Sequence, residues 1–276
     1  MGPTPDKAPM FTLGDSEFPT DNESLQKALE AYITRMGGRP GGVELDGMFP
    51  SFAAIRLNMT GARFPAKFWH TPEAEGETRT FSTRLMEITG TPAMIDELRF
   101  ILTFRAEDCV FVCGKAEDGT RLINAQNCVE GETIITATTE EIGKFLQGAA
   151  EKAASAHGAH IQSVNISLES PTAWSVAAKA TAVAKAMLFT ATLNFEGRLE
   201  VGGNLEVRFR DLRCNGTGML ATLAANFVRN RIEQLEGKRI PITRCVPRDN
   251  PIRNVVLQSE GGFRMRISFG IKREPR

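Results

Sequence analysis

The sequence has little of what an enzyme active site needs. Its 276 residues include three histidines, and the motifs G-x-S-x-G, H-E-x-x-H, G-x-G-x-x-G and the P-loop do not occur. The carboxylate pairs Glu107-Asp108 and Glu140-Glu141 fit a turn and the first turn of a helix. We therefore expect no catalytic residues, no cofactor and no enzyme activity.

Patterns for metal binding are also scarce. The five cysteines contain no C-x-x-C pair, which argues against zinc. His157 and His160 could hold a metal together, but Gly158 separates them and no carboxylate is close in sequence, so a histidine near a helix dipole is favoured. Buried reduced thiols are favoured for the cysteines, and one disulfide with spare thiols stays open. The cysteines are Cys109, Cys113, Cys128, Cys214 and Cys245.

The sequence also lacks a membrane-spanning run. No apolar stretch approaches the roughly 18 residues that a span requires. Residues 1–13 have neither the basic nor the apolar region of a signal peptide. As written, the chain is expected to be soluble and cytoplasmic, and a place in the cell envelope stays open if a signal segment was removed.

Charge is balanced over the whole chain but not locally. There are 33 Lys and Arg and 33 Asp and Glu, yet ten basic residues meet three acids in 237–276. Such a region attracts the phosphate of a lipid head group or of a nucleic acid, or is a solvated face that keeps a sheet soluble. The sequence leaves both open. The ten are Lys238, Arg239, Arg244, Arg248, Arg253, Arg264, Arg266, Lys272, Arg273 and Arg276, and the three are Asp249, Glu260 and Glu274.

Apolar periodicity and turn residues predict an α+β fold. One helix is expected at 21–37, capped by Asp21 or Asn22, and another at 138–158, where Thr138 and Glu141 have the spacing of a capping box. Successive strands without intervening helices favour an antiparallel sheet. The strands are expected at 43–45, 52–60, 80–89, 98–105, 110–114, 121–125, 132–136, 163–169, 174–186, 186–201 and 205–215.

The stretch 216–272 organises the rest of the chain. Residues 218–235 place apolar side chains at three- and four-residue steps, so one face of a helix there must lie on something, which we expect to be the sheet. Gly237 and Pro241 mark the end of that helix. In 263–272 apolar residues alternate with mostly cationic or small polar ones, which predicts a strand with one apolar and one cationic face.

Several short phrases carry a family resemblance. They are T-T-E-E-I-G-K-F-L at 138–146, F-E-G-R-L-E-V at 195–201, R-D-L-R at 210–213, L-E-G-K-R-I-P-I at 235–242 and the strand pair at 252–269. In these phrases and in the order of its elements the chain resembles bacterial LmeA-like phospholipid-binding proteins and, more loosely, the tubular lipid-binding (TULIP) superfamily. The resemblance implies a highly curved antiparallel sheet wrapped around long amphipathic helices, with an elongated cavity for acyl chains. It brings no catalytic residue, and the missing signal segment and the cysteines depart from members of the cell envelope.

Small residues on the longest expected strands are a separate reason to consider a ligand. Alanine is a poor strand former, so its abundance here leaves room for an acyl chain or permits close packing under the helices, and both stay open. These alanines are Ala177, Ala178, Ala180, Ala182, Ala184, Ala186 and Ala191. The expected lining of the cavity is Ile142, Phe145, Leu146, Phe189, Leu193, Leu220, Leu223, Phe227, Met265 and Ile267.

Three arginines are the expected contacts for a lipid head group: Arg231, Arg264 and Arg266. Arg231 falls near the middle of the apolar face of 218–235, where a lone charge is costly. It either reaches water or a carboxylate, or its guanidinium binds a lipid phosphate near the mouth of the cavity.

These observations favour non-catalytic binding or transfer of a phospholipid-like lipid, with its acyl chains in an elongated apolar cavity and an anionic head group near basic residues at the mouth. Peripheral contact with an anionic membrane and a homodimer stay open. The alternative is a structural or scaffold protein with a fully packed core whose basic C-terminal face docks a partner. Nucleic acid is not expected, because the aromatic residues of the last strand alternate onto the face opposite Arg264 and Arg266.

The expected organisation is a disordered leader at 1–20 and a single domain at 21–276. Within that domain we expect a helix at 21–37, a strand-rich half at 41–137, a helix with a sheet at 138–215, and a helix with strands at 216–272.

Overall fold

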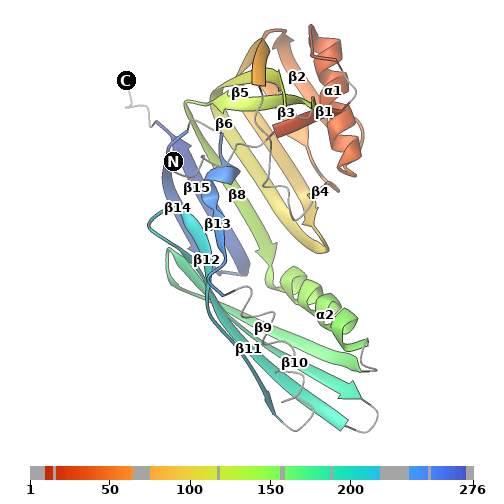
Figure 1. The fold of residues 1–276 in the computed structure, drawn as a ribbon, viewed down its shortest axis with the longest axis vertical. Coiled ribbons are helices and arrows are strands. Elements are labelled where there is room, and N and C mark those ends of the chain that lie inside the picture. Colours follow the sequence, from red (N-terminus) through yellow and green to blue (C-terminus); the bar gives the residue numbers. More distant parts are fainter. Residues whose placement is uncertain are drawn as a thin grey trace.

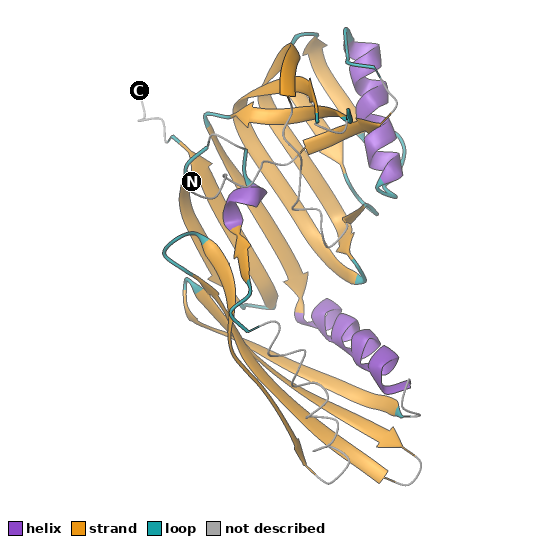
Figure 2. Cartoon of the chain, in the orientation of Figure 1, coloured by secondary structure: helices purple, strands orange, loops and turns teal. Residues whose placement is uncertain are grey.

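The protein is made mostly of β-strands. About 65% of the residues that the structure describes are in strands and 15% in helices, and the strands form two sheets (Figures 1 and 2). The structure is a computed structural model, and it describes residues 10–14, 17–64, 75–116, 119–155, 159–186, 189–217, 236–247 and 250–271.

The expected α+β fold, a highly curved sheet wrapped around long amphipathic helices, is therefore wrong. The two α-helices of the described residues are α1 (Asn22–Arg35) and α2 (Thr139–Ser155), with 14 and 17 residues. At 1.5 Å per residue they are roughly 20–25 Å long, whereas the longest strand has 21 residues and extends for roughly 65–70 Å. Helices this short cover only part of each sheet. The helix expected at 218–235 lies outside the described residues.

The larger sheet has ten strands. Its main path is β14-β15-β8-β6-β5-β3-β2, while β4 pairs with β5, β7 with β6, and β1 with β7. The strands are β1 (Met10–Gly14), β2 (Val43–Met48), β3 (Ser51–Asn58), β4 (Arg63–Phe64), β5 (Glu75–Ile95), β6 (Leu98–Lys115), β7 (Arg121–Asn127), β8 (Glu130–Thr138), β14 (Ile252–Gln258) and β15 (Gly262–Gly270). β1 lies within the stretch expected to be a disordered leader, and its Leu13 is buried.

Two details of this sheet differ from the sequence-based expectation. β6 continues through the break predicted between 105 and 110, because its pairing with β5 runs through these residues without a change of register. β3 and β4 pair with β5 in parallel, not antiparallel. The chain between Asn58 and Glu75 is long enough for the crossover connection that parallel neighbours require.

The smaller sheet has five antiparallel strands in the order β13-β12-β11-β10-β9. The strands are β9 (His160–Thr172), β10 (Ser175–Ala186), β11 (Phe189–Val201), β12 (Glu206–Thr217) and β13 (Arg239–Pro241), and a 3-10 helix, η1 (Ile242–Cys245), follows β13. Figure 1 shows this sheet extending away from the lower end of the larger one, with α2 beside the junction.

One core holds the two sheets together. Leu25, Leu29 and Ile33 of α1 are buried with residues of the larger sheet in a single apolar cluster. The same cluster reaches Val176 and Val201 of the smaller sheet. α1 begins as predicted, because the Asp21 carboxylate accepts a hydrogen bond from the Ser24 backbone N–H at 2.8 Å and completes a capping box.

Candidate functional site

The smaller sheet has one apolar face and one polar face. Ala180 of β10 lies directly opposite Ile166 of β9 and Phe195 of β11. Its neighbour Lys179 points to the other side, where Glu196 of β11 lies opposite it. The sheet is therefore amphipathic along most of its length.

Small side chains form a row along the apolar face. Because side chains two positions apart share a face, the alanines of β10 alternate into one line, and larger apolar side chains lie on both neighbouring strands. The apolar face is consequently lower along β10 than along β9, and lower than β11 at Leu193 and Phe195. The small row is Ala178, Ala180, Ala182 and Ala184; on β9, Leu168, Ile166 and Val164 lie opposite the first three, and on β11, Gly197, Phe195, Leu193 and Ala191 lie opposite the four in turn.

Little of this apolar face is fully buried away from the junction. Ala182 and Leu193 are 4% and 9% exposed, whereas Val164, Ala191 and Phe195 pack against them only half-buried. Burying apolar surface stabilises by about 25 cal/mol per Å². Any further apolar group that covered this face would therefore be bound favourably.

Helix α2 covers the β9 side of this face. A Cβ atom added at Gly143 would lie 3.9 Å from Cγ2 of Ile166, so the backbone of the helix lies close to the apolar face. At its start, the Glu141 N–H donates to Oγ1 of Thr138 at 3.2 Å, as the predicted capping spacing requires.

Two contacts hold the other end of α2. The Ile161 N–H donates to the Glu151 carboxylate at 2.7 Å, which together with His160 lowers the pKa of that carboxyl. Nζ of Lys152 lies 2.5 Å from Oε1 of Glu97, in the turn between β5 and β6. α2 is therefore connected to both sheets.

The structure divides the predicted cavity lining between the two sheets. Phe145 and Leu146 are half-buried on α2, and Leu193 is buried on β11. Met265 and Ile267 lie instead on β15 of the larger sheet, where Ile267 is fully buried. The described lining residues thus do not form one surface.

Other predicted residues cannot be placed around this face. Ile142 is half-buried on α2 and packs against the main core. Phe189 begins β11, but its side chain lies outside the described residues, as do Leu220, Leu223 and Phe227.

The predicted head-group arginines do not meet at the smaller sheet. Arg231 lies outside the described residues. Arg264 and Arg266 lie on β15, on the face opposite the core-facing Ile267. Nε of Arg266 is 3.2 Å from the Glu132 carboxylate, while Nε of Arg264 is buried and has no hydrogen-bond partner in the described structure.

Carboxylates also neutralise other cations of the C-terminal region. Arg239 lies 3.8 Å from Glu206, and Arg253 lies 3.5 Å from Glu130. Where the structure describes it, the basic region predicted from the sequence therefore carries less free charge than its composition suggests.

A feature that sequence reasoning missed runs across the outer face of the larger sheet. Five side chains of alternating charge lie directly opposite one another on β2, β3, β5, β6 and β8. We call this set, Glu44, Arg56, Glu87, Arg105 and Glu132, the charge ladder. Arg56 lies 3.0 Å from Glu87 and 3.8 Å from Glu44, and Arg105 lies 3.7 Å from Glu87.

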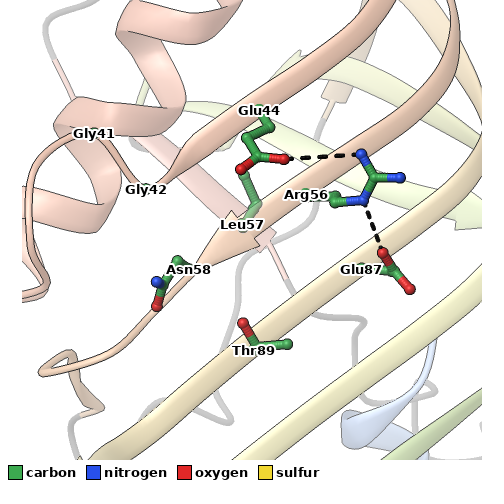
Figure 3. A pocket seen from close by; sticks show the side chains of 8 residues that line it. All are labelled: Gly41, Gly42, Glu44, Arg56, Leu57, Asn58, Glu87 and Thr89. Carbon is green, nitrogen blue, oxygen red and sulfur yellow. Dashed lines mark hydrogen bonds and ion pairs between the residues drawn. The ribbon is translucent and has the colours of Figure 1, made fainter.

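A hollow of about 220 Å³ opens beside the charge ladder (Figure 3). It is lined by Gly41, Gly42, Glu44, Arg56, Leu57, Asn58, Glu87 and Thr89. Figure 3 shows Arg56 held between the two glutamates, so the cation of the hollow is already paired with both of its carboxylates. The hollow is also smaller than the roughly 300–1,000 Å³ typical of ligand pockets.

The described residues show no arrangement for metal chemistry. No group of three or more His, Cys, Asp or Glu side chains among them could hold a metal ion. Nδ1 of His160 lies 3.1 Å from the Glu151 carboxylate, and His157 lies outside the described residues. Among the residues that the structure describes, no helix has the length and apolar character needed to cross a membrane.

The register explains what the sequence could not indicate. The charge ladder requires the register of five strands at once. Two of these strands, β3 and β5, pair in parallel, whereas the sequence predicted antiparallel pairing. The row of alanines was visible in the sequence, but its flanking rows follow only from the pairing of β9, β10 and β11. Comparisons with protein-family models, with curated proteins and with solved structures gave no match for this chain.

Proposed function

We propose that the protein binds a long apolar ligand, such as the acyl chain of a lipid, on the apolar face of the smaller sheet beside α2. The observation that carries the proposal is the row of alanines on β10, flanked on β9, and at Phe195 of β11, by larger apolar side chains that are only half-buried. Partly exposed apolar surface that is continuous along one face of a sheet is a feature of binding sites.

The dimensions of the row fit an acyl chain. Six residue steps separate Ala178 from Ala184, which at about 3.4 Å per step is roughly 20 Å. The hydrocarbon core of a bilayer is about 30 Å thick, so the chains of one leaflet extend for about 15 Å. Each methylene that is removed from water contributes about 0.8 kcal/mol, and ten of them contribute about 8 kcal/mol before the cost of association.

The proposal also follows the ligand class that the LmeA-like resemblance implies. It no longer depends on a sheet wrapped around long helices. The head-group contacts stay a prediction, since Arg264 and Arg266 lie on the other sheet and Arg266 is paired with Glu132.

The test uses two alanines of the same strand that face opposite sides. Ala180 lies on the apolar face, whereas Ala177 lies opposite Glu169 and Arg198 on the polar face. Both are half-buried. Tryptophan at either position adds the same bulk, so only its position differs.

Lipids are first extracted from the purified full chain and identified by mass spectrometry, and binding of a pyrene-labelled phosphatidylcholine is then titrated by fluorescence. We expect Ala180→Trp to weaken binding at least tenfold and Ala177→Trp to change it less than twofold, with both variants showing the far-UV circular dichroism of the parent. Equal effects of the two variants, or a parent chain that neither retains nor binds lipid, would reject the proposal and favour the scaffold alternative.

A further inference from the structure

Two buried cysteines of the larger sheet lie against each other. Sγ of Cys109 and Sγ of Cys128 are 2.7 Å apart. This distance exceeds the length of an S–S bond, about 2.05 Å, by less than about 1 Å. Their side chains are 0% and 2% exposed. The residues are 19 positions apart in the sequence, so only the fold brings them together.

The strand register explains this contact. Val110 of β6 lies opposite Asn127 of β7, and both side chains are exposed. Because side chains alternate between the faces of a sheet, the flanking residues Cys109 and Cys128 both turn to the core face. The pairing of β6 with β7 therefore places the two thiols together.

Buried hydrogen bonds fix the position of Cys128. Its backbone N–H donates to Oδ1 of Asn250 at 2.9 Å, and its carbonyl accepts a hydrogen bond from Nδ2 of the same side chain. Asn250 is itself 8% exposed. On the other side, β5 and β7 flank the β6 segment that carries Cys109. Strand pairing thus holds Cys109, and the Asn250 side chain holds Cys128, without a bond between the two cysteines.

The other described cysteines cannot take the place of either partner. Cys113 is buried on the same face of β6 but is four residues from Cys109, or roughly 13 Å along the strand. Cys214 lies on β12 of the smaller sheet. The side chain of Cys245 lies outside the described residues.

We propose that Cys109 and Cys128 are the site of a structural disulfide that forms as β6 and β7 pair during folding. Two thiols and the disulfide of a donor, such as glutathione disulfide, exchange in two steps. The Cys109–Cys128 bond forms and the S–S bond of the donor breaks. The donor takes up the two protons and two electrons of the cysteine thiols and is released as two thiols.

Burial decides when this exchange takes place. A donor cannot reach sulfur atoms that the native core covers, so the bond forms before the core closes. The contact with Cys128 and the burial of the site also raise the pKa of the Cys109 thiol, which makes the folded dithiol a poor nucleophile. Once formed, the disulfide is protected from reductants in the same way.

The experiment counts free thiols in the full chain. The protein is refolded in a glutathione redox buffer, denatured without reductant, treated with N-ethylmaleimide and weighed by mass spectrometry. We expect three adducts on the five cysteines, a mass that is 2 Da below that of the fully reduced chain once the three adducts are subtracted, and a cross-linked peptide that contains Cys109 and Cys128.

Matched variants keep the test specific. Cys113→Ala keeps the cross-link and leaves two adducts, whereas Cys109→Ala and Cys128→Ala each leave four. A cross-link that closes a loop of this length should raise the melting temperature of the oxidised parent by roughly 6–12 °C over the reduced and refolded parent. Five adducts on the oxidised parent, or a cross-link between other cysteines, would overturn the proposal. The peptide map of the parent decides it even if a variant does not fold.

Discussion

Reversing the central charge of the charge ladder should destabilise the larger sheet. Glu87 lies 3.0 Å from Arg56 and 3.7 Å from Arg105, and its side chain is 28% exposed. Partly exposed ion pairs between neighbouring strands are each worth about 0.2–1 kcal/mol. Glu87→Lys loses two such pairs and places like charges at both positions, so we expect the free energy of unfolding to fall by about 1–3 kcal/mol. Glu87→Gln removes the pairs without adding repulsion and should cost less.

The assay is equilibrium unfolding in urea, because guanidinium chloride would itself screen the charges. Between 0.1 M and 1 M salt the Debye length falls from about 10 Å to about 3 Å, so the difference between parent and Glu87→Lys should shrink by about half in 1 M NaCl. Glu260→Lys makes the same change of charge in an exposed turn for which no ion pair is recorded in the described structure, and it serves as the control. Equal midpoints for the two variants at low salt, or a difference that salt does not change, would refute the reasoning.

Three further outcomes are expected. Phe269→Ala should lower the free energy of unfolding by about 3–5 kcal/mol, because the ring is fully buried and stacks on Phe104 at a centroid distance of 5.8 Å. Ile271 is exposed, so Ile271→Ala should change the free energy of unfolding by less than about 0.5 kcal/mol. Similar losses for both variants would contradict the burial of Phe269. Asp21→Ala should cost about 0.5–2 kcal/mol by removing the cap of α1, while Asp21→Asn keeps most of it, so equal losses in thermal unfolding would argue against capping. Glu151→Gln should lower the melting temperature at pH 7. The N–H of Ile161, and next His160, lower the pKa of Glu151 in the folded state. The stabilisation by this carboxylate is therefore present above the unfolded pKa of about 4.3 and is lost as the pH falls through the folded pKa. A difference between parent and variant that stays constant down to pH 3 would rule out this carboxylate as its source.

Local signals predicted the parts of the fold that local interactions determine. The starts of α1 and α2 depend on side chains within three residues of each helix end, and both caps were visible as Asp21 and Thr138. The hairpin of β14 and β15 was visible too, since its alternation reflects burial on one face of a single strand pair. Such features need no information about distant parts of the chain.

The parts that failed depend on partners far apart in sequence. The parallel pairing of β3 with β5 and the length of the β5–β6 hairpin are decided by which strands meet, and apolar periodicity does not specify that. The cationic C-terminal region illustrates the same limit, because Arg239 and Arg253 are neutralised by Glu206 and Glu130, which precede them by 33 and 123 positions. The lining of the candidate site was only partly predictable, because Met265 and Ile267 have the right pattern but belong to the other sheet.

The placement of α2 links the mechanics of the two sheets. The helix begins at the residue after Thr138, the last residue of β8, and is tied at its other end to Ile161 of β9 and to Glu97 at the tip of the β5–β6 hairpin. α2 therefore couples the positions of the two sheets. A change in the tilt of the smaller sheet would strain the contacts at both ends of the helix, including its junction with β8. A ligand that displaced α2 would then increase the amide exchange rates of β8 in the larger sheet.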